Sequence, residues 1–162
     1  MLKKPEIKKI LYCTDLGKHT SPVFMNALAQ AEKNNAPITV IHVVEPMTES
    51  AKAVVRTYMS DIDIDAIQRE GMDKIFASMK KRIDSFLREK CGKSFESAPI
   101  KEILIVAGRP SEEILNTVKD QGFDLIVLGK SSGKVLGHRV MGSTARRVNR
   151  LSRVPVLVVP NR

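Results

Sequence analysis

Five short runs of aliphatic residues alternate along this chain with segments whose apolar residues recur at helical spacing. The runs lie at residues 7–14, 38–44, 100–108, 123–129 and 154–160. Continuous aliphatic runs of this length are typical of strands that are buried on both faces. Because these strands alternate with helices, the sequence predicts an α/β fold in which helices cover both sides of one parallel sheet.

Segments with helical periodicity fill the intervals between the runs. Their spacing predicts helices over residues 21–34 and about 67–90, and two more that begin at Pro110 and Ser143. Proline suits a first helical turn, and the acidic residues that follow Pro110 favour the helix dipole. The interval 46–64 is polar and irregular, and no helix or strand is expected there.

Length and composition restrict the classes of protein to consider. A chain of 162 residues without repeats or linker-like stretches is expected to form one domain, residues 1–162. No run approaches the roughly 18 apolar residues that cross a bilayer, and the charged start has no secretory pattern. The two cysteines, Cys13 and Cys91, form no CxxC pair. We therefore expect a cytoplasmic protein with no membrane partner and no disulfide.

Side chains that bind metal ions are scattered. His19, His42 and His138 have no cysteine or carboxylate at ligand spacing, so no metal site is expected. His42 lies inside a predicted strand and is expected to be packed and hydrogen-bonded. The acidic stretch SDIDID, residues 60–65, lacks the glycine and closing glutamate of a calcium loop and is expected to begin the long helix.

The positive charge is concentrated at the end of the chain. The net charge is +9, and residues 130–162 hold eight lysines or arginines and no acidic residue. Such a segment attracts the phosphates of a nucleotide, a nucleic acid or a membrane, or it forms a solvated surface. The same segment has no Phe, Tyr or Trp to stack on bases, which disfavours a nucleic-acid binder.

The segment LIVLGKSSGKVLGHRVMGST, residues 125–144, contains the Gly-Lys-Ser of a phosphate-binding motif. A Walker P-loop requires a glycine five positions before Gly129, and Asp124 stands there. The first strand is followed by DLGKHT, which is not the glycine pattern of a dinucleotide fold. Both motifs are therefore excluded.

A different phosphate site remains open. Gly129 ends a predicted strand, and Gly142-Ser143-Thr144 opens a helix whose first amides and hydroxyls can bind an anion. The alternative is an ordinary capped helix after a flexible loop. No nucleophile has a matched base and no carboxylate pair is placed for hydrolysis, so an enzyme is not expected and slow ATP hydrolysis is the most the residues allow.

These residues resemble the universal stress protein family of the ATP-binding type. The segment GKSSGKVLGHRVMGS is similar to the family signature G-x2-G-x9-G-[S/T], with Gly129, Gly142 and Ser143 in matching positions. Ser132 replaces the second glycine of the signature. The segments KKILYCTD, VIHVVEP, FDLIVLGK and RVPVLVVP resemble family strands, and the likeness covers roughly residues 5 to 160.

The resemblance implies an open, doubly wound five-stranded parallel sheet of order 3-2-1-4-5, like the adenine nucleotide alpha hydrolases. It also implies that ATP, with Mg²⁺ as a companion ion, lies over the carboxyl ends of the first and fourth strands. The implied binding residues are Cys13, Thr14, Asp15, Val43, Leu128, Gly129, Lys130, Ser131, Ser132, Gly142, Ser143 and Thr144. Within this set, Asp15 would meet the nucleoside or cap the turn that follows it, and Cys13 would border the site as a packed thiol.

Residues 154–159 are expected to join two copies of the chain. Pro155 lies inside this apolar strand and Pro160 follows it. A proline inside a strand indicates an edge position, and the resemblance implies pairing of this strand in a homodimer. Two alternatives stay open. One is a stress protein that binds no nucleotide and acts through dimerisation and protein partners, and the other, weaker one is a nucleic-acid binder that uses the basic end of the chain.

Overall fold

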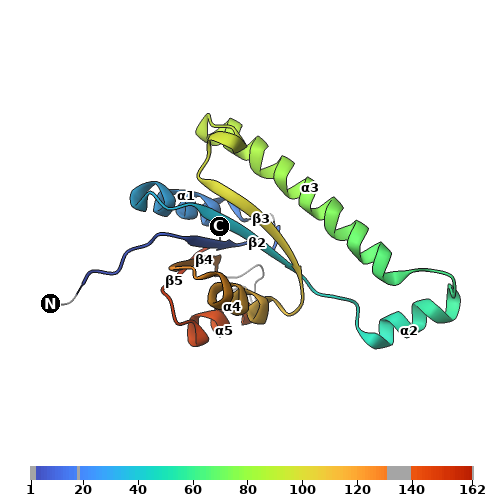
Figure 1. The fold of residues 1–162 in the computed structure, drawn as a ribbon. Coiled ribbons are helices and arrows are strands. Elements are labelled where there is room, and N and C mark those ends of the chain that lie inside the picture. Colours follow the sequence, from blue (N-terminus) through green and yellow to red (C-terminus); the bar gives the residue numbers. More distant parts are fainter. Residues whose placement is uncertain (1–2, 18, 131–139, 162) are drawn as a thin grey trace.

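The computed structural model describes residues 3–17, 19–130 and 140–161 (Figure 1). Its strands are β1 (Ile10–Cys13), β2 (Ile38–Val44), β3 (Ile100–Ala107), β4 (Leu125–Gly129) and β5 (Val156–Val159). Its helices are α1 (Ser21–Asn34), α2 (Glu49–Tyr58), α3 (Ile64–Cys91), α4 (Pro110–Gln121) and α5 (Ser143–Leu151), with a 3-10 helix η1 (Phe95–Ser97). None of the helices in these ranges is long and apolar enough to cross a membrane.

The sheet has the strand order β3-β2-β1-β4-β5, and every pair of neighbours is parallel. The predicted fold and strand order are confirmed. The chain builds outward from β1 to β3 and then returns to the other side of β1 to add β4 and β5. The strand order therefore reverses between β1 and β4, where the loops that leave the two strands part and open a crevice.

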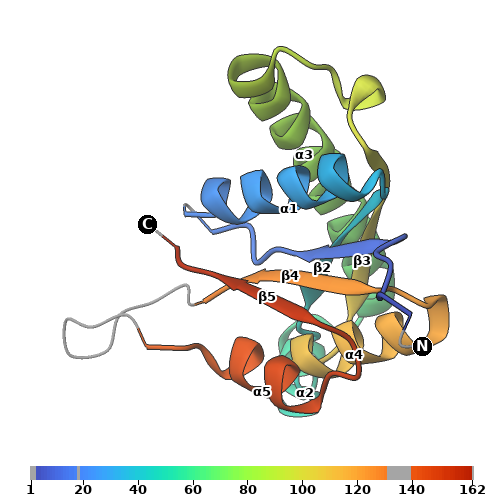
Figure 2. The same ribbon diagram turned by 90° about the vertical axis from the view of Figure 1, so that its left-hand side faces the viewer.

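Helices cover both faces of the sheet, with α1 and α3 on one side and α4 and α5 on the other (Figure 2). Alternate side chains of β1 pack into the core layers on the two faces of the sheet. Ile10 and Tyr12 pack in the layer of α1 and α3, whereas Leu11 and Cys13 pack in the layer of α4 and α5. All four are buried, which explains why the strand reads as an unbroken apolar run.

The interval 46–64 differs from its predicted irregular structure, because it contains α2. Thr48 caps this helix by accepting a hydrogen bond from the Ala51 amide at 3.2 Å. No residue of α2 is buried, so the helix lacks the core-facing residues on which the prediction relied. With the first part of α3, it stands away from the sheet (Figure 1).

The acidic stretch at residues 60–65 begins α3, as predicted. Asp63 accepts a hydrogen bond from the Ala66 amide at 2.9 Å and caps the helix. The helix therefore begins three residues before the predicted Ile67 and runs to Cys91, where Gly92 adopts φ +61° and ends it.

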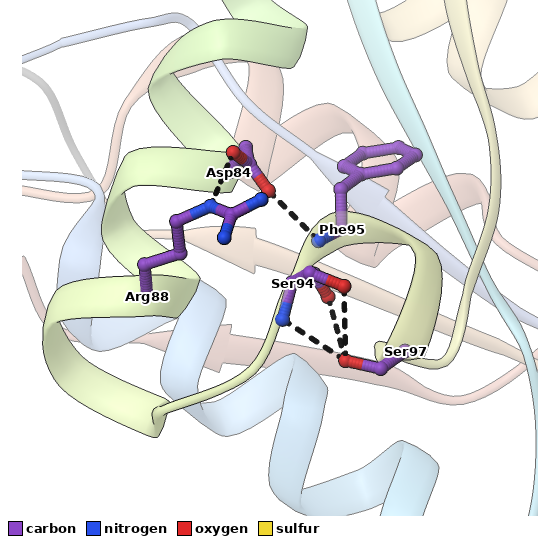
Figure 3. A network of polar contacts seen from close by, with 5 residues as sticks. All are labelled: Asp84, Arg88, Ser94, Phe95 and Ser97. Carbon is purple, nitrogen blue, oxygen red and sulfur yellow. Dashed lines mark hydrogen bonds and ion pairs between the residues drawn. The ribbon is translucent and has the colours of Figure 1, made fainter.

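The far end of α3 is tied to the segment that leads into β3 (Figure 3). Asp84 accepts hydrogen bonds from Arg88 Nε at 2.8 Å and from the Phe95 amide at 2.9 Å. These two hydrogen bonds hold the pKa of Asp84 below its ordinary value, and the bond from Arg88 has the larger effect. One carboxylate therefore joins a helix turn to η1.

We expect Asp84→Asn to lower the stability of the protein at neutral pH but much less in acid. Because the folded-state pKa lies below the ordinary value of 3.8, the ionised carboxylate stabilises the fold above that pH. This contribution disappears as the pH falls through the lowered pKa. Urea unfolding of wild type and variant along a pH series measures the difference, and Glu70→Gln, which removes an exposed partner of Lys74, is the control. A difference that stays constant into acid would contradict this role.

Candidate functional site

A cavity of about 530 Å³ opens at the carboxyl ends of β1 and β4, where the strand order reverses. Its volume lies within the usual range of small-molecule sites, about 300–1,000 Å³. Ten residues expected at the binding site line this cavity: Cys13, Thr14, Asp15, Val43, Leu128, Gly129, Lys130, Gly142, Ser143 and Thr144. The other two, Ser131 and Ser132, lie outside the described residues.

One part of the cavity wall is apolar. Ile41 and Val43 of β2, Leu128 of β4 and Ile114 of α4 bring aliphatic side chains to it. These residues also belong to, or pack against, the core layer between the sheet and α4 and α5. The apolar wall is therefore a surface of the core itself, and a flat aromatic group can lie on it.

The loop after β1 brings a carboxylate to the same cavity. Asp15 Oδ1 accepts a hydrogen bond from the Gly17 amide at 2.8 Å, and Thr14 Oγ1 accepts one from the Leu16 amide at 3.1 Å. The two side chains cap a tight turn in which Leu16 adopts φ +60°. Asp15 thus caps the turn and lines the cavity, so its two expected roles are compatible.

Three further titratable side chains lie at this end of the sheet, those of His42, Tyr12 and Cys13. His42 Nδ1 lies 2.8 Å from the Thr14 carbonyl oxygen, which only accepts, so Nδ1 carries the hydrogen. Burial raises the pKa of the Tyr12 hydroxyl to about 12 and raises the pKa of the Cys13 thiol. His42 is thus hydrogen-bonded as predicted, and Cys13 is a buried, free thiol without the thiolate character of a reactive centre.

Another part of the wall suits an anion. Gly142, in extended conformation, precedes the first turn of α5, and its amide donates to the Lys130 carbonyl at 2.9 Å. This bond draws the end of β4 and the start of α5 together beside the cavity. The first amides of a helix have no partner within the helix and carry its positive dipole end. Lys130 and Arg146 also line the cavity and add positive charge.

The described residues hold no group of three histidine, cysteine or acidic side chains able to bind a metal ion. The described residues that line the cavity bring together an apolar wall, one carboxylate, and a group of amides, hydroxyls and cations. A ligand with an aromatic part, a polyol and a phosphate matches this distribution of groups.

The universal stress protein family model matches residues 6–160 of the chain. The chain belongs to this family. Universal stress protein YxiE of Bacillus subtilis is 29% identical over 151 residues, which cover 93% of this chain and 97% of the relative. Universal stress protein MJ0577 of Methanocaldococcus jannaschii is 24% identical over 156 residues, 94% of either chain.

Solved structures of universal stress proteins share this fold, which is adenine nucleotide alpha hydrolase-like. That of MJ0577 matches with a TM-score of 0.68 and 25% identity, over 96% of this chain and 97% of the other. A universal stress protein in complex with cAMP matches with a TM-score of 0.57 and 21% identity, over 96% of this chain and 98% of the other. The universal stress protein from Archaeoglobus fulgidus in complex with dAMP matches with a TM-score of 0.56 and 18% identity, over 96% of this chain and 99% of the other.

Several residues that line the cavity of this universal stress protein were missed by the sequence analysis. They include Thr20, Pro110, Ile114, Met141, Arg146 and Asn161. The sequence places Pro110 and Ile114 only in the helix that begins at Pro110, and Arg146 only in the basic segment 130–162. Their place at the cavity depends on how α4 and α5 pack, which helical periodicity does not reveal.

Asn161 was missed for a different reason, since it follows the last strand in a segment without pattern. It is only 8% exposed and donates from Nδ2 to the His19 carbonyl at 3.3 Å. Its carboxamide also packs on Gly129: a methyl group on Gly129 would lie 2.6 Å from Nδ2 and 2.7 Å from Oδ1. A contact inside the protein therefore favours glycine at the first position of the signature.

We expect Gly129→Ala to destabilise the protein by about 1–3 kcal/mol, the usual cost of overpacking. Asn161→Ala in the same chain should recover part of that loss, because the alanine vacates the space that the new methyl group needs. Thermal unfolding of both single variants and the double variant measures the coupling. Gly71→Ala is the control, since a methyl group there meets nothing within 4 Å. Strict additivity of the two substitutions would contradict the contact.

Proposed function

We propose that this universal stress protein binds an adenine nucleotide, ATP above all, and acts as a nucleotide-responsive module rather than as an enzyme. The observation that carries the proposal is the cavity at the β1/β4 crevice, whose apolar wall and group of amides, hydroxyls and cations face one space of suitable volume. Two universal stress proteins of the same fold, described in complex with cAMP and dAMP, add support for an adenine nucleotide. The free cysteines, Cys13 and Cys91, favour a cytoplasmic setting.

In this proposal the nucleoside occupies the end of the cavity beside β1 and β2. The adenine ring lies on the aliphatic side chains that include Val43 and Leu128, beside the packed thiol of Cys13. The Asp15 carboxylate, next to Thr14, accepts hydrogen bonds from the ribose hydroxyls. A carboxylate on a ribose also explains why an acidic group belongs in an otherwise basic site.

The phosphates occupy the other end. Gly129 and Gly142 leave the backbone open there, Ser143 and Thr144 offer amides and hydroxyls at the start of α5, and Lys130 supplies charge. We include Ser131 and Ser132 in the phosphate site on the strength of the family signature. Mg²⁺ would reach the site with the phosphate oxygens, which is its usual way of binding beside nucleotides.

In this proposal Asp15 binds the ribose and is given no role in hydrolysis. Burial holds the thiol of Cys13 and the hydroxyl of Tyr12 neutral, which disfavours either of them as a base or nucleophile. Hydrolysis, if measured, should therefore be slow. The second candidate is a stress protein that binds no nucleotide and acts through dimerisation, which the apolar edge strand β5 favours.

Titration calorimetry on nucleotide-stripped protein, with ATP and Mg²⁺, tests the proposal directly. We expect heat of binding at millimolar ATP or below, and release of adenine nucleotide when the freshly purified protein is extracted with acid. Gly142→Val should abolish binding, because a β-branched side chain keeps the phosphates from the backbone. Absence of both the heat and the extractable nucleotide would favour the second candidate.

Charge reversal at Lys130 separates the electrostatic part of binding. We expect Lys130→Glu to weaken ATP binding on the order of tenfold at low ionic strength and less at high salt, where exposed charges are screened. Adenosine affinity should change little. Lys119→Glu alters the same net charge in the last turn of α4, away from the cavity, and serves as the control. Equal losses in both variants would show a general charge effect instead of a phosphate contact.

We further propose that the protein forms a homodimer through β5. This strand lies at the edge of the sheet, where one row of its backbone groups has no strand beside it in the described structure. The strand is apolar, and a bare apolar edge promotes pairing with another chain.

We expect light scattering to report a dimer at tens of micromolar and Val158→Lys to shift it toward monomer, because lysine on an edge strand opposes pairing. Val158 lies outside both clusters of core residues, so the fold should survive the change. Val54→Lys on the exposed face of α2 is the control. A wild-type protein that stays monomeric at this concentration would overturn the dimer.

A further inference from the structure

The loop that carries Asp15 combines two local caps with one strained residue. Leu16 adopts φ +60°, a backbone conformation that non-glycine residues rarely take. Leu16 packs against the core layer of α1 and α3, and a cavity of about 70 Å³ lies between the loop and these two helices. Contacts from outside the loop must therefore contribute to its conformation.

Two of these contacts come from one side chain in the second half of α3. Arg82 donates from Nη1 to the Leu16 carbonyl at 2.8 Å and from Nη2 to the Gly17 carbonyl at 2.9 Å. The two nitrogens form a rigid planar fork, so one guanidinium fixes two successive peptide groups at once. The loop thus receives both its local caps, from Thr14 and Asp15, and an anchor from a distant helix.

Arg82 does not line the nucleotide cavity, whereas Asp15 does. The guanidinium bonds to the carbonyls on the far side of the turn, and the Gly17 amide of the same turn bonds to Asp15 Oδ1. The position of the carboxylate therefore depends on peptide groups that Arg82 holds.

We propose that Arg82 is a positioning residue of the nucleotide site: it fixes the loop at residues 14–17 so that Asp15 meets the ribose. The inference rests on the nucleotide binding proposed above. It makes α3 part of the site without contact to the ligand. Because coupling between two sites is reciprocal, a nucleotide that orders the loop also strengthens its attachment to α3.

The test compares Arg82→Met, Arg82→Lys and the control Arg88→Met. Both residues lie in the second half of α3, and Arg88 bonds to Asp84 and not to the loop. Calorimetry with adenosine and with ATP should give a Kd raised on the order of tenfold for both ligands in Arg82→Met. Lysine has donors but lacks the rigid fork that meets both carbonyls at once, so Arg82→Lys should recover about half of that loss on a logarithmic scale. Arg88→Met should bind like wild type.

The adenosine measurement separates positioning from long-range attraction. If Arg82 only attracted phosphate, its removal would weaken ATP and spare adenosine, and the loss would shrink at high salt. That result would overturn the inference. Equal loss in the Arg88→Met control would overturn it as well, because it would show an effect of helix stability or net charge.

Hydrogen exchange gives a readout that needs no ligand. The Leu16 and Gly17 amides donate hydrogen bonds to Thr14 and Asp15. These amides should exchange faster in Arg82→Met than in Arg88→Met when the two variants are compared under conditions of equal stability. If wild type binds neither adenosine nor ATP, the proposed function fails, and these two amides still decide whether Arg82 holds the loop. Unchanged exchange there would overturn the anchor itself.

Discussion

The pairing of β1 with β4 is the constraint on which the rest of the structure depends. β1 is the first strand in the chain, yet it lies in the centre of the sheet with β2 on one side and β4 on the other. Its four residues are buried on both faces and pair in register from Ile10 with Leu125 to Cys13 with Leu128. This pairing sends the loops after the two strands to opposite faces, and the space between them is the cavity. A different neighbour for β1 would leave the chain with a core but without this site.

The two parts of the cavity are built by different means. The apolar wall is an extension of the core, so its position is fixed by packing. The polar groups lie on loops, and each loop is fastened by contacts that span the chain. The Lys130 amide donates to the Val159 carbonyl, Asn161 donates to the His19 carbonyl, and Arg82 donates to two carbonyls after Asp15. As a result β5, the edge strand, and α3, the longest helix, both contribute to the site.

The α2 helix and the first part of α3 form the region least explained by the core. α2 has no buried residue, and Val54 and Tyr58 on it are 59% and 84% exposed. Local capping at Thr48 and Asp63 accounts for the helix starts. The sequence analysis missed α2 because it searched for helices by their core-facing residues, and a helix that stands off the sheet needs none.

The sequence alone determined the strands, most helices and the parallel sheet, because each buried strand and each amphipathic helix shows its environment in a few neighbouring residues. It also marked Asp15, Gly129 and Gly142, through strand ends and a glycine signature that are local in the chain. Only the tertiary structure placed Arg82 and Asn161 beside the loop after β1. These two residues act across 66 and 142 positions of sequence, respectively. No local pattern marks such a contact, because the geometry that creates it arises when the helices pack on the sheet.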